Sequence, residues 1–227
     1  MIAAEDKDLD ASAAYFEEAV ELRERWDPDP WRLANDLNNV AAVRDLQGGR
    51  FAEAEPLARK AVESAREFLP SGHPDRIDKE LELAVTLAEL RPDEALAAYE
   101  ELVAGCRSFL TEHPREAGVR TILASALLGQ GRLERQLGRE DETTRSFAAV
   151  EEAVDLDRAD EDLAWTAFRA RSLLQRGMNA DAAPLLEILD KASWKDENLD
   201  GLLDNASPRE HEMVGLRSTL RRSSPRQ

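Results

Sequence analysis

The sequence predicts an all-α protein built from a repeated pair of antiparallel helices. Three observations lead to this prediction: the composition, a repeat of about forty residues, and the lack of strand-like alternation. The 227 residues are 42% hydrophobic, 34% charged and only 5% aromatic. Alanine, leucine, glutamate and arginine dominate this mixture, and they favour helices because they lose little conformational entropy there. No stretch alternates apolar and polar residues regularly enough to predict a strand.

A four-letter word marks the repeat. EEAV at 17–20 aligns with RKAV at 59–62, EELV at 100–103 and EEAV at 151–154. The starting positions of these words differ by 42, 41 and 51 residues. Each copy lies in a segment whose apolar residues recur three, four and seven positions apart, which predicts an amphipathic helix. The first of these helices is expected from Leu9 to Trp26.

A second helix is expected between successive copies, and its boundaries carry their own signals. Proline is tolerated in the first turn of a helix, where its missing N–H would be unpaired anyway. Such starts are expected at Asp29-Pro30, His73-Pro74 and His113-Pro114. Tight turns, three of them with glycine, should end these helices. They are 47–50 (QGGR), 90–93 (LRPD), 137–140 (LGRE) and 176–179 (RGMN).

The repeat resembles a known family. Residues 37–57, LNNVAAVRDLQGGRFAEAEPL, resemble the tetratricopeptide repeat (TPR) of kinesin light chains and related bacterial proteins. Residues 127–148 resemble the shorter form of the repeat, with Gly131 and Gly138 seven apart. The resemblance implies a solenoid of antiparallel helix pairs wound into a right-handed superhelix, with the first helix of each pair lining a concave groove.

The expected organisation has three parts. Residues 1–195 form the repeat array, 196–222 a capping helix region, and 223–227 a disordered tail. The segment 207–210, SPRE, has a capping-box pattern with proline at the first helical position. A terminal repeat needs such a cover because its apolar face would otherwise meet water.

Charge and composition narrow the partners. The net charge of −17 disfavours nucleic acid, because a surface this negative repels phosphate backbones. A short basic tail with Arg217, Arg221, Arg222 and Arg226 is the exception. A single cysteine, Cys106, fits a reducing compartment and a small core residue. No segment is long and apolar enough to span a membrane, so a cytoplasmic location is expected.

The residues of catalytic type do not form a catalytic pattern. The Glu17-Glu18, Glu100-Glu101 and Glu151-Glu152 pairs occupy equivalent positions of separate repeats, so they are expected on solvated helix faces. His73, His113 and His211 lie far apart in the sequence, which disfavours a metal site. We therefore predict that the protein is not an enzyme and that it binds no metal or cofactor.

The TPR resemblance implies a binding surface in the groove. By position, the groove side chains would be Asn35, Asn38, Asn39, Lys79, Glu82, Thr86, Arg132, Arg135, Gln136 and Arg171. Asn38 and Asn39 are expected to be exposed and to bond the backbone of an extended peptide. The predicted function is a scaffold or adaptor for a protein or peptide partner. The alternatives are a ligand-responsive regulatory module that works with a separate transcriptional, ATPase or protease component, and, more remotely, a helical-repeat enzyme.

The first helix predicts a second contact surface. It is apolar on two sides, and one stripe should pack on the helix that begins near Trp31. The other stripe includes Tyr15, Leu22 and Trp26, and nothing in the sequence is expected to cover it. Such a patch at the end of a solenoid usually marks an association surface. The expectation is a homodimer or a hetero-complex formed through this helix.

Overall fold

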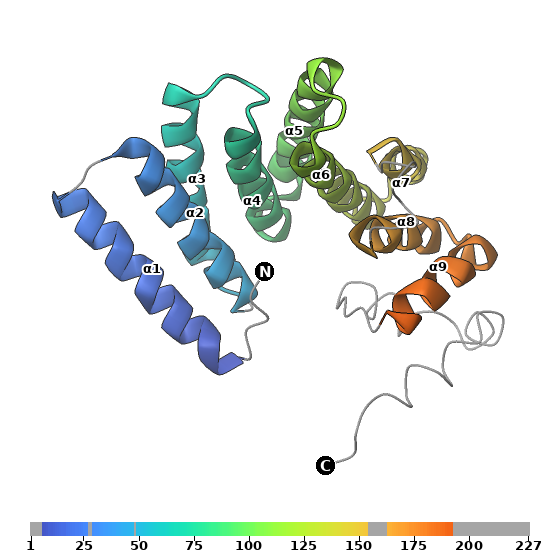
Figure 1. Ribbon diagram of the computed structural model, residues 1–227, viewed down its shortest axis with the longest axis horizontal. Helices are drawn as coiled ribbons and strands as arrows, with labels where there is room; N and C mark the ends of the chain where they lie inside the picture. The colour runs from blue at the N-terminus through green and yellow to red at the C-terminus, as the bar shows by residue number, and fades with distance from the viewer. Residues whose placement is uncertain (1–5, 27–28, 48, 154–162, 193–227) are drawn as a thin grey trace, which may run out of the picture. The chain divides into compact units, whose positions relative to one another are not determined.

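The computed structural model describes residues 6–26, 29–47, 49–153 and 163–192. These residues form nine α-helices and no strand (Figure 1), as the sequence predicted. The helices are α1 (Asp6–Trp26), α2 (Pro30–Leu46), α3 (Phe51–Phe68), α4 (Pro74–Leu90), α5 (Pro92–Glu112), α6 (Ala117–Gln136), α7 (Glu140–Ala153), α8 (Leu163–Gln175) and α9 (Asn179–Lys191). The predicted capping helix region at 196–222, the tail at 223–227 and His211 lie outside the described residues.

Two of the three predicted helix starts are confirmed. Asp29 caps α2 by accepting the Trp31 and Arg32 backbone N–H groups at 3.0 and 3.3 Å. His73 caps α4, its Nδ1 accepting the Asp75 N–H at 3.3 Å.

The third start is wrong. The His113-Pro114 pair does not open α6, which begins at Ala117. A turn comes first, closed by the Glu116 N–H donating to the His113 carbonyl at 3.1 Å. The Glu116 carbonyl then accepts from Arg120, so the first helical bond of α6 starts three residues later than expected.

The predicted turns are short. Gly49, Gly138 and Gly177 adopt φ values of 78°, 72° and 72°, a left-handed region that glycine enters without steric cost. The α4–α5 turn has no glycine, and Arg91 alone separates the two helices, with Pro92 as the first residue of α5. These tight connections make the flanking helices antiparallel neighbours.

The chain divides into two compact units, Met1–Leu133 and Glu134–Gln227, with the boundary inside α6. In the first unit each helix from α1 to α5 packs on the next, and α2 also contacts α4 directly. Hence α2 and α4 share one layer, while α3 runs antiparallel between them (Figure 1). Asn38 of α2 reaches Asp78 of α4, and Asp45 of α2 reaches Thr86. From the first contact to the second, the residue number increases along both helices, so α2 and α4 are parallel.

Small residues allow this close packing in the first unit. Ala41 of α2 forms a fully buried cluster with Ala54 and Ala58 of α3, against which Leu57 and Leu83 pack. Farther along the unit, the Tyr99 ring of α5 lies against the α6 backbone at Gly129. A Cβ at position 129 would lie 2.6 Å from the Tyr99 hydroxyl oxygen. Glycine is therefore required there unless Tyr99 moves.

The second unit has its own core. Residues of α8 and α9 form a buried cluster of Ala167, Ala170, Leu173, Ala182, Leu186 and Leu189. The Ser172 hydroxyl of α8 donates to the Phe147 carbonyl of α7 at 2.6 Å, entirely inside the protein. This bond satisfies a hydroxyl that would otherwise be buried without a partner.

The repeated EEAV word has a structural role. Glu17, in its first copy, forms an ion pair with Arg44 of α2. Glu151, in the last copy, forms one with Arg176, which directly follows α8, at 3.0 Å. In both cases the first glutamate of the word fastens its helix to the next one. Glu17 and Glu151 are half-buried, whereas the other four glutamates are on exposed helix faces as expected: Glu18, Glu100, Glu101 and Glu152.

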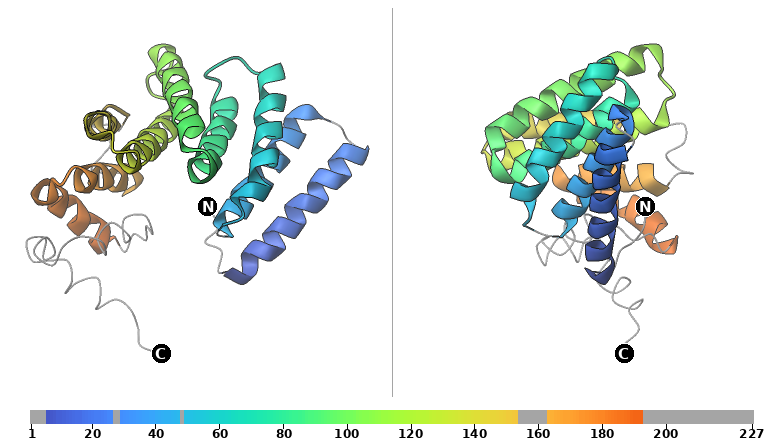
Figure 2. Two further views of the ribbon diagram at one scale, coloured as in Figure 1. Left: turned by 180° about the vertical axis from the view of Figure 1, so that it is seen from behind. Right: turned by 90° about the vertical axis from the view of Figure 1, so that its left-hand side faces the viewer.

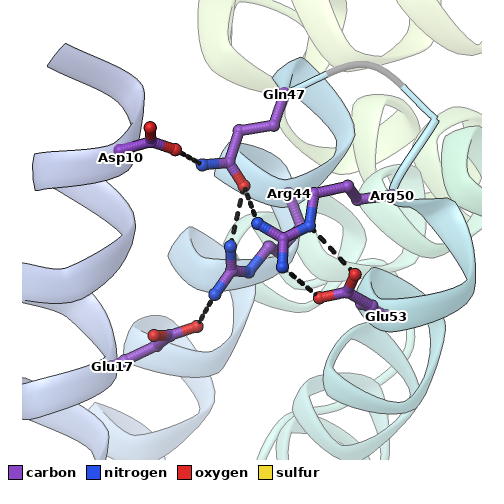
Figure 3. A network of polar contacts seen from close by, with 6 residues as sticks. All are labelled: Asp10, Glu17, Arg44, Gln47, Arg50 and Glu53. Carbon is purple, nitrogen blue, oxygen red and sulfur yellow. Dashed lines mark hydrogen bonds and ion pairs between the residues drawn. The ribbon is translucent and has the colours of Figure 1, made fainter. Parts of the chain in front are cut away.

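A polar network around Gln47 fixes α1 and α3 to the end of α2 (Figure 3). The Gln47 amide donates to Asp10 of α1 at 2.6 Å, and its oxygen accepts from Arg44 at 2.8 Å and Arg50 at 3.1 Å. Arg50 also pairs with Glu53 in the first turn of α3, with Nε 2.9 Å from Oε1. One neutral side chain thus links three helices at the C-terminus of α2.

We predict that Ala61→Arg unfolds or strongly destabilises the first unit. Ala61 of α3 is fully buried, so a long cation there combines overpacking with an uncompensated charge, at a cost of about 3 kcal/mol or more. Thermal and urea unfolding followed by circular dichroism measure the effect. The matched control is Glu63→Arg, an exposed position on the same helix, expected within about 0.5 kcal/mol of wild type. Equal stability of the two variants would contradict the packing described.

Candidate functional site

The structure places the ten predicted groove residues in both compact units. Those in the first unit are Asn35, Asn38 and Asn39 on α2, Lys79, Glu82 and Thr86 on α4, and Arg132 on α6. Those in the second unit are Arg135, Gln136 and Arg171. The α2 and α4 residues are brought together, because these two helices are in direct contact.

Three of these residues are not exposed as the groove prediction required. Asn38 is 9% exposed, Lys79 3% and Thr86 is fully buried. These three side chains contact residues of the neighbouring parallel helix and are directed away from water. Asn39 is exposed, and Asn35 and Glu82 are half-buried.

The three buried residues lie beside half-buried Asp45 and Glu82 and exposed Asp78. We call this set of six the α2–α4 seam: Asn38, Asp45, Asp78, Lys79, Glu82 and Thr86. The Thr86 hydroxyl donates to Asp45 Oδ2 at 2.6 Å. The Asn38 amide donates to Asp78 Oδ2 at 3.4 Å. Lys79 Nζ lies 3.4 Å from the same Asp78 oxygen and 5.3 Å from the centre of the Trp31 ring. Polar side chains of the two helices thus meet at both ends of the seam.

Carboxyl groups crowd the seam. Burial, together with the nearby charges of Asp45 and Asp78, raises the pKa of Glu82 to about 8. Burial also raises the pKa of Asp45, against the opposing effect of the hydrogen bond from Thr86. The carboxyl groups of Asp45 and Glu82 interact with each other. In a partly dry environment such a pair shares a proton more readily than it carries two charges.

Sequence reasoning missed Asp45, Asp78 and Trp31. A signal for the two aspartates was available: Asn38 and Asp78 are 40 residues apart, and Asp45 and Thr86 are 41 apart. These separations are within two residues of the repeat steps of 41 and 42, so polar residues about one repeat apart were candidates for pairing with each other. Trp31 carried no comparable signal, since its role depends on where the Lys79 side chain turns.

The arginines predicted for the groove have different environments. Arg132 and Gln136 are exposed. The Arg135 guanidinium lies 4.9 Å from the centre of the Phe147 ring and donates to the Gln175 carbonyl and side chain. Arg171 lies 5.1 Å from the Phe168 ring centre. Arg135 and Arg171 thus have packing roles within the second unit.

The predicted association surface on α1 is exposed. Tyr15, Leu22 and Trp26 are 69%, 52% and 71% exposed. The opposite flank packs on α2 through the buried Ala13 and the half-buried Phe16. In the right-hand view of Figure 2, α1 lies nearest the viewer, and no described helix of the first unit covers its outer flank.

The comparison with solved structures agrees with this helix arrangement. The chain is similar to a crystal structure of a putative kinesin light chain from Podosopora anserina with nearly identical TPR-like repeats. The TM-score is 0.55 at 23% sequence identity, over 82% of this chain and 89% of that one. The fold is TPR-like. Neither a family model nor a curated protein matches the sequence.

In the described part of this TPR-like chain, Cys106 is buried and the His113 ring packs against a neighbouring ring. Burial raises the pKa of the Cys106 thiol to about 12, as expected of a core cysteine. The His113 ring packs 4.5 Å from that of Phe109. Among the described residues, no group of three or more histidine, cysteine or acidic side chains could hold a metal ion. None of the described helices meets the length and hydropathy that a membrane crossing requires.

A shallow pocket lies away from the seam, between α3, α4 and α5. Its lining residues are Arg66, Glu80, Leu83, Ala98, Glu101 and Leu102. Arg66 pairs with both of its glutamates, at 3.3 Å from Glu80 and 3.4 Å from Glu101. The charged side chains of this pocket are thus already paired with one another.

We predict that Glu82→Gln stabilises the protein in alkaline solution. Glu82 faces Asp45 and Asp78, with Glu89 near Asp45 and Lys79 one turn away. Its pKa rises from 4.5 to about 8, so the folded state retains a proton that the unfolded state has released across this window. Wild-type stability therefore falls as the pH rises through the window. The Glu82→Gln variant has no carboxyl group at this position, so its stability does not fall in this way.

The measurement is urea unfolding at about pH 5 and about pH 9. We expect Glu82→Gln to exceed wild type by about 1 kcal/mol or more at the higher pH, with a smaller difference at the lower pH. Glu67→Gln, an exposed position on α3, should show no such pH dependence. An identical offset at both pH values would show that the carboxyl pair is not strained by charge.

Proposed function

We propose that this protein is a non-catalytic scaffold that binds an extended peptide segment of a partner protein along the α2–α4 seam. The proposal rests on one observation: buried polar side chains in the seam lie next to accessible polar side chains at its edge, which we call the rim. Asn39 is exposed, and Asn35 and Glu82 are half-buried, on the two parallel helices that form the seam. An ordinary repeat interface would be apolar, since unpaired polar groups are costly to bury.

The rim residues have the chemistry that peptide recognition needs. An asparagine amide can donate to a peptide carbonyl and accept from a peptide N–H at once. Asn35 and Asn39 are four residues apart on α2, so their side chains lie on one helix face. Parallel helices in register present such groups in a row, which suits an extended chain.

We predict that the double variant Asn35→Ala/Asn39→Ala loses peptide affinity without losing structure. Peptides would be selected from a displayed random linear library on the wild-type protein and their affinities measured by calorimetry. Two lost hydrogen bonds, each worth about 0.5–1.5 kcal/mol, should weaken binding about tenfold. The control Glu63→Ala/Glu67→Ala, at two exposed positions on α3, should bind as wild type does. Equal affinity in both double variants would move the site elsewhere.

A second surface, on α1, favours assembly with another copy of this chain. Tyr15, Leu22 and Trp26 share the exposed flank with Glu18 and Arg25. An antiparallel pairing of two α1 helices centred near Leu22 would place Glu18 of one copy opposite Arg25 of the other. The flank is thus complementary to itself in charge, and its aromatic residues are the usual anchors of such interfaces.

We predict that the wild-type protein shows a concentration-dependent monomer–dimer equilibrium, and that Tyr15→Glu/Leu22→Glu remains monomeric. The Leu22→Glu carboxylates of the two copies would lie close together near the pairing axis and repel each other, and Tyr15→Glu removes an aromatic anchor. Sedimentation velocity over a range of protein concentrations measures both. The control is Glu63→Gln/Glu67→Gln on α3, which should dimerise normally. A wild type that stays monomeric at every concentration would eliminate the second copy as the occupant of this flank.

A further inference from the structure

The end helix α1 has a smaller apolar contact than the helices that follow it. Among its residues 9–26, whose burial is described, only Ala13 is buried. By comparison, α3 and α5 contribute five and six residues to the core. Apolar stabilisation grows with the area removed from water, so a helix that buries one small side chain gains little of it.

Polar links to α2 and α3 hold α1 along most of its length. From the start of α1 to its end, the linked pairs are Asp10–Gln47, Glu17–Arg44, Arg23–Asp36 and Glu24–Lys60. Figure 3 shows the first two of them. Three of the four are ion pairs, and the first is a hydrogen bond from a neutral amide to a carboxylate. Charge is therefore the main fastening of this helix.

The partners of α1 on α2 lie along one side of that helix. Arg44 and Gln47 follow Asp36 by eight and eleven residues, which is about two and three helical turns. Leu33 and Val40 fall on the same side by the same spacing. Leu33 is half-buried and Val40 is 2% exposed. The α2 face that meets α1 is thus an apolar strip between charged side chains.

The rest of the first unit does not depend on α1 for its packing. The cluster of Ala41, Ala54 and Ala58 joins α2 to α3, and α2 also contacts α4 directly. The neighbours of α2 would therefore still hold it if α1 left. Parts of a protein with few buried contacts open first, while the better packed parts remain folded.

We propose that α1 is a releasable end helix, which leaves α2 when its ion pairs weaken while α2–α5 stay folded. Ion pairs between accessible side chains contribute little stability, and dissolved salt screens them. The Glu24 and Lys60 side chains are each about half exposed, at 48% and 49%, and Glu17 is 45% exposed. Ionic strength therefore controls the release.

The release changes two surfaces at once. It uncovers the apolar strip with Leu33 and Val40 on α2, and it separates the exposed α1 flank with Tyr15 and Trp26 from the array. The device is independent of the peptide site proposed above, because the α2 residues that hold α1 are Asp36, Arg44 and Gln47 rather than those of the seam.

The first test is hydrogen exchange of the full chain, followed by mass spectrometry, in solutions dilute enough for sedimentation to show a monomer. Helical amides depend on tertiary packing for most of their protection, so the α1 amides exchange once the helix leaves α2. We expect their exchange to quicken about tenfold between about 0.05 M and about 0.5 M sodium chloride, with α3 and α5 unchanged. Exchange in α1 that is independent of salt, or that quickens together with α3, would overturn the proposal.

A pair of matched variants separates the ion pairs from general effects of salt. Glu17→Gln/Arg23→Gln removes two of the links and leaves the net charge unchanged. Glu21→Gln/Arg25→Gln makes the same two changes at exposed positions of the same helix. We expect about tenfold faster exchange of α1 in the first variant and wild-type exchange in the second. Equal exchange in the two variants would contradict the role of the ion pairs.

A peptide probes whether the α2 face opens. The probe is a fluorescent peptide of residues 6–26 with Tyr15→Glu and Leu22→Glu, two changes that disable the outer flank and keep the side that faces α2. The intrachain helix competes with it at high effective concentration. We expect about tenfold tighter binding to Glu17→Gln/Arg23→Gln than to wild type or to Glu21→Gln/Arg25→Gln, since the competitor is weakened in that variant alone. Equal affinity for the three proteins, or binding to none of them, would overturn the opening of this face.

Discussion

Close contact between helices at alanine positions is the constraint on which the first unit depends. Ala41, Ala54 and Ala58 are fully buried in one cluster, where any larger side chain would separate α2 from α3. Because α3 sits so tightly between its neighbours, α2 and α4 come into direct contact. That contact creates the seam. A looser packing would leave the same polar residues facing water, with ordinary hydration and ordinary pKa values.

In this packing, the pKa values of two glutamates are shifted in opposite directions. Glu55 on α3 is partly buried, which opposes ionisation, yet hydrogen bonds from Arg59 and Arg91 hold its pKa below the usual value. Glu82 on α4 is surrounded by other acids, and burial with these charges raises its pKa. The first carboxylate fastens neighbouring repeats together. The second weakens its own repeat interface at alkaline pH, which is a cost expected of a binding site rather than of a structural residue.

The two proposed surfaces have different physical characters. The α1 flank is apolar and aromatic, and its charges complement one another between copies, so it suits a second copy of the chain. The seam is polar, and the asparagines at its edge suit the backbone of an extended peptide. Ion pairs and the Gln47 network hold α1 against α2 and α3, which keeps Tyr15 and Trp26 outside. Assembly and peptide binding would therefore use separate faces of the same unit.

The sequence alone determined the helical class, the repeat step and the turns, because helix periodicity, glycine and proline act locally. The prediction of groove residues on α2, α4 and later helices came from the TPR resemblance instead. Tertiary structure decided which side chains reach solvent: Asn38, Lys79 and Thr86 lie on the predicted face, yet the neighbouring parallel helix covers them. It also decided that Asp45 joins Glu82. Burial and charge crowding depend on contacts between residues about forty positions apart, and local patterns do not report those contacts.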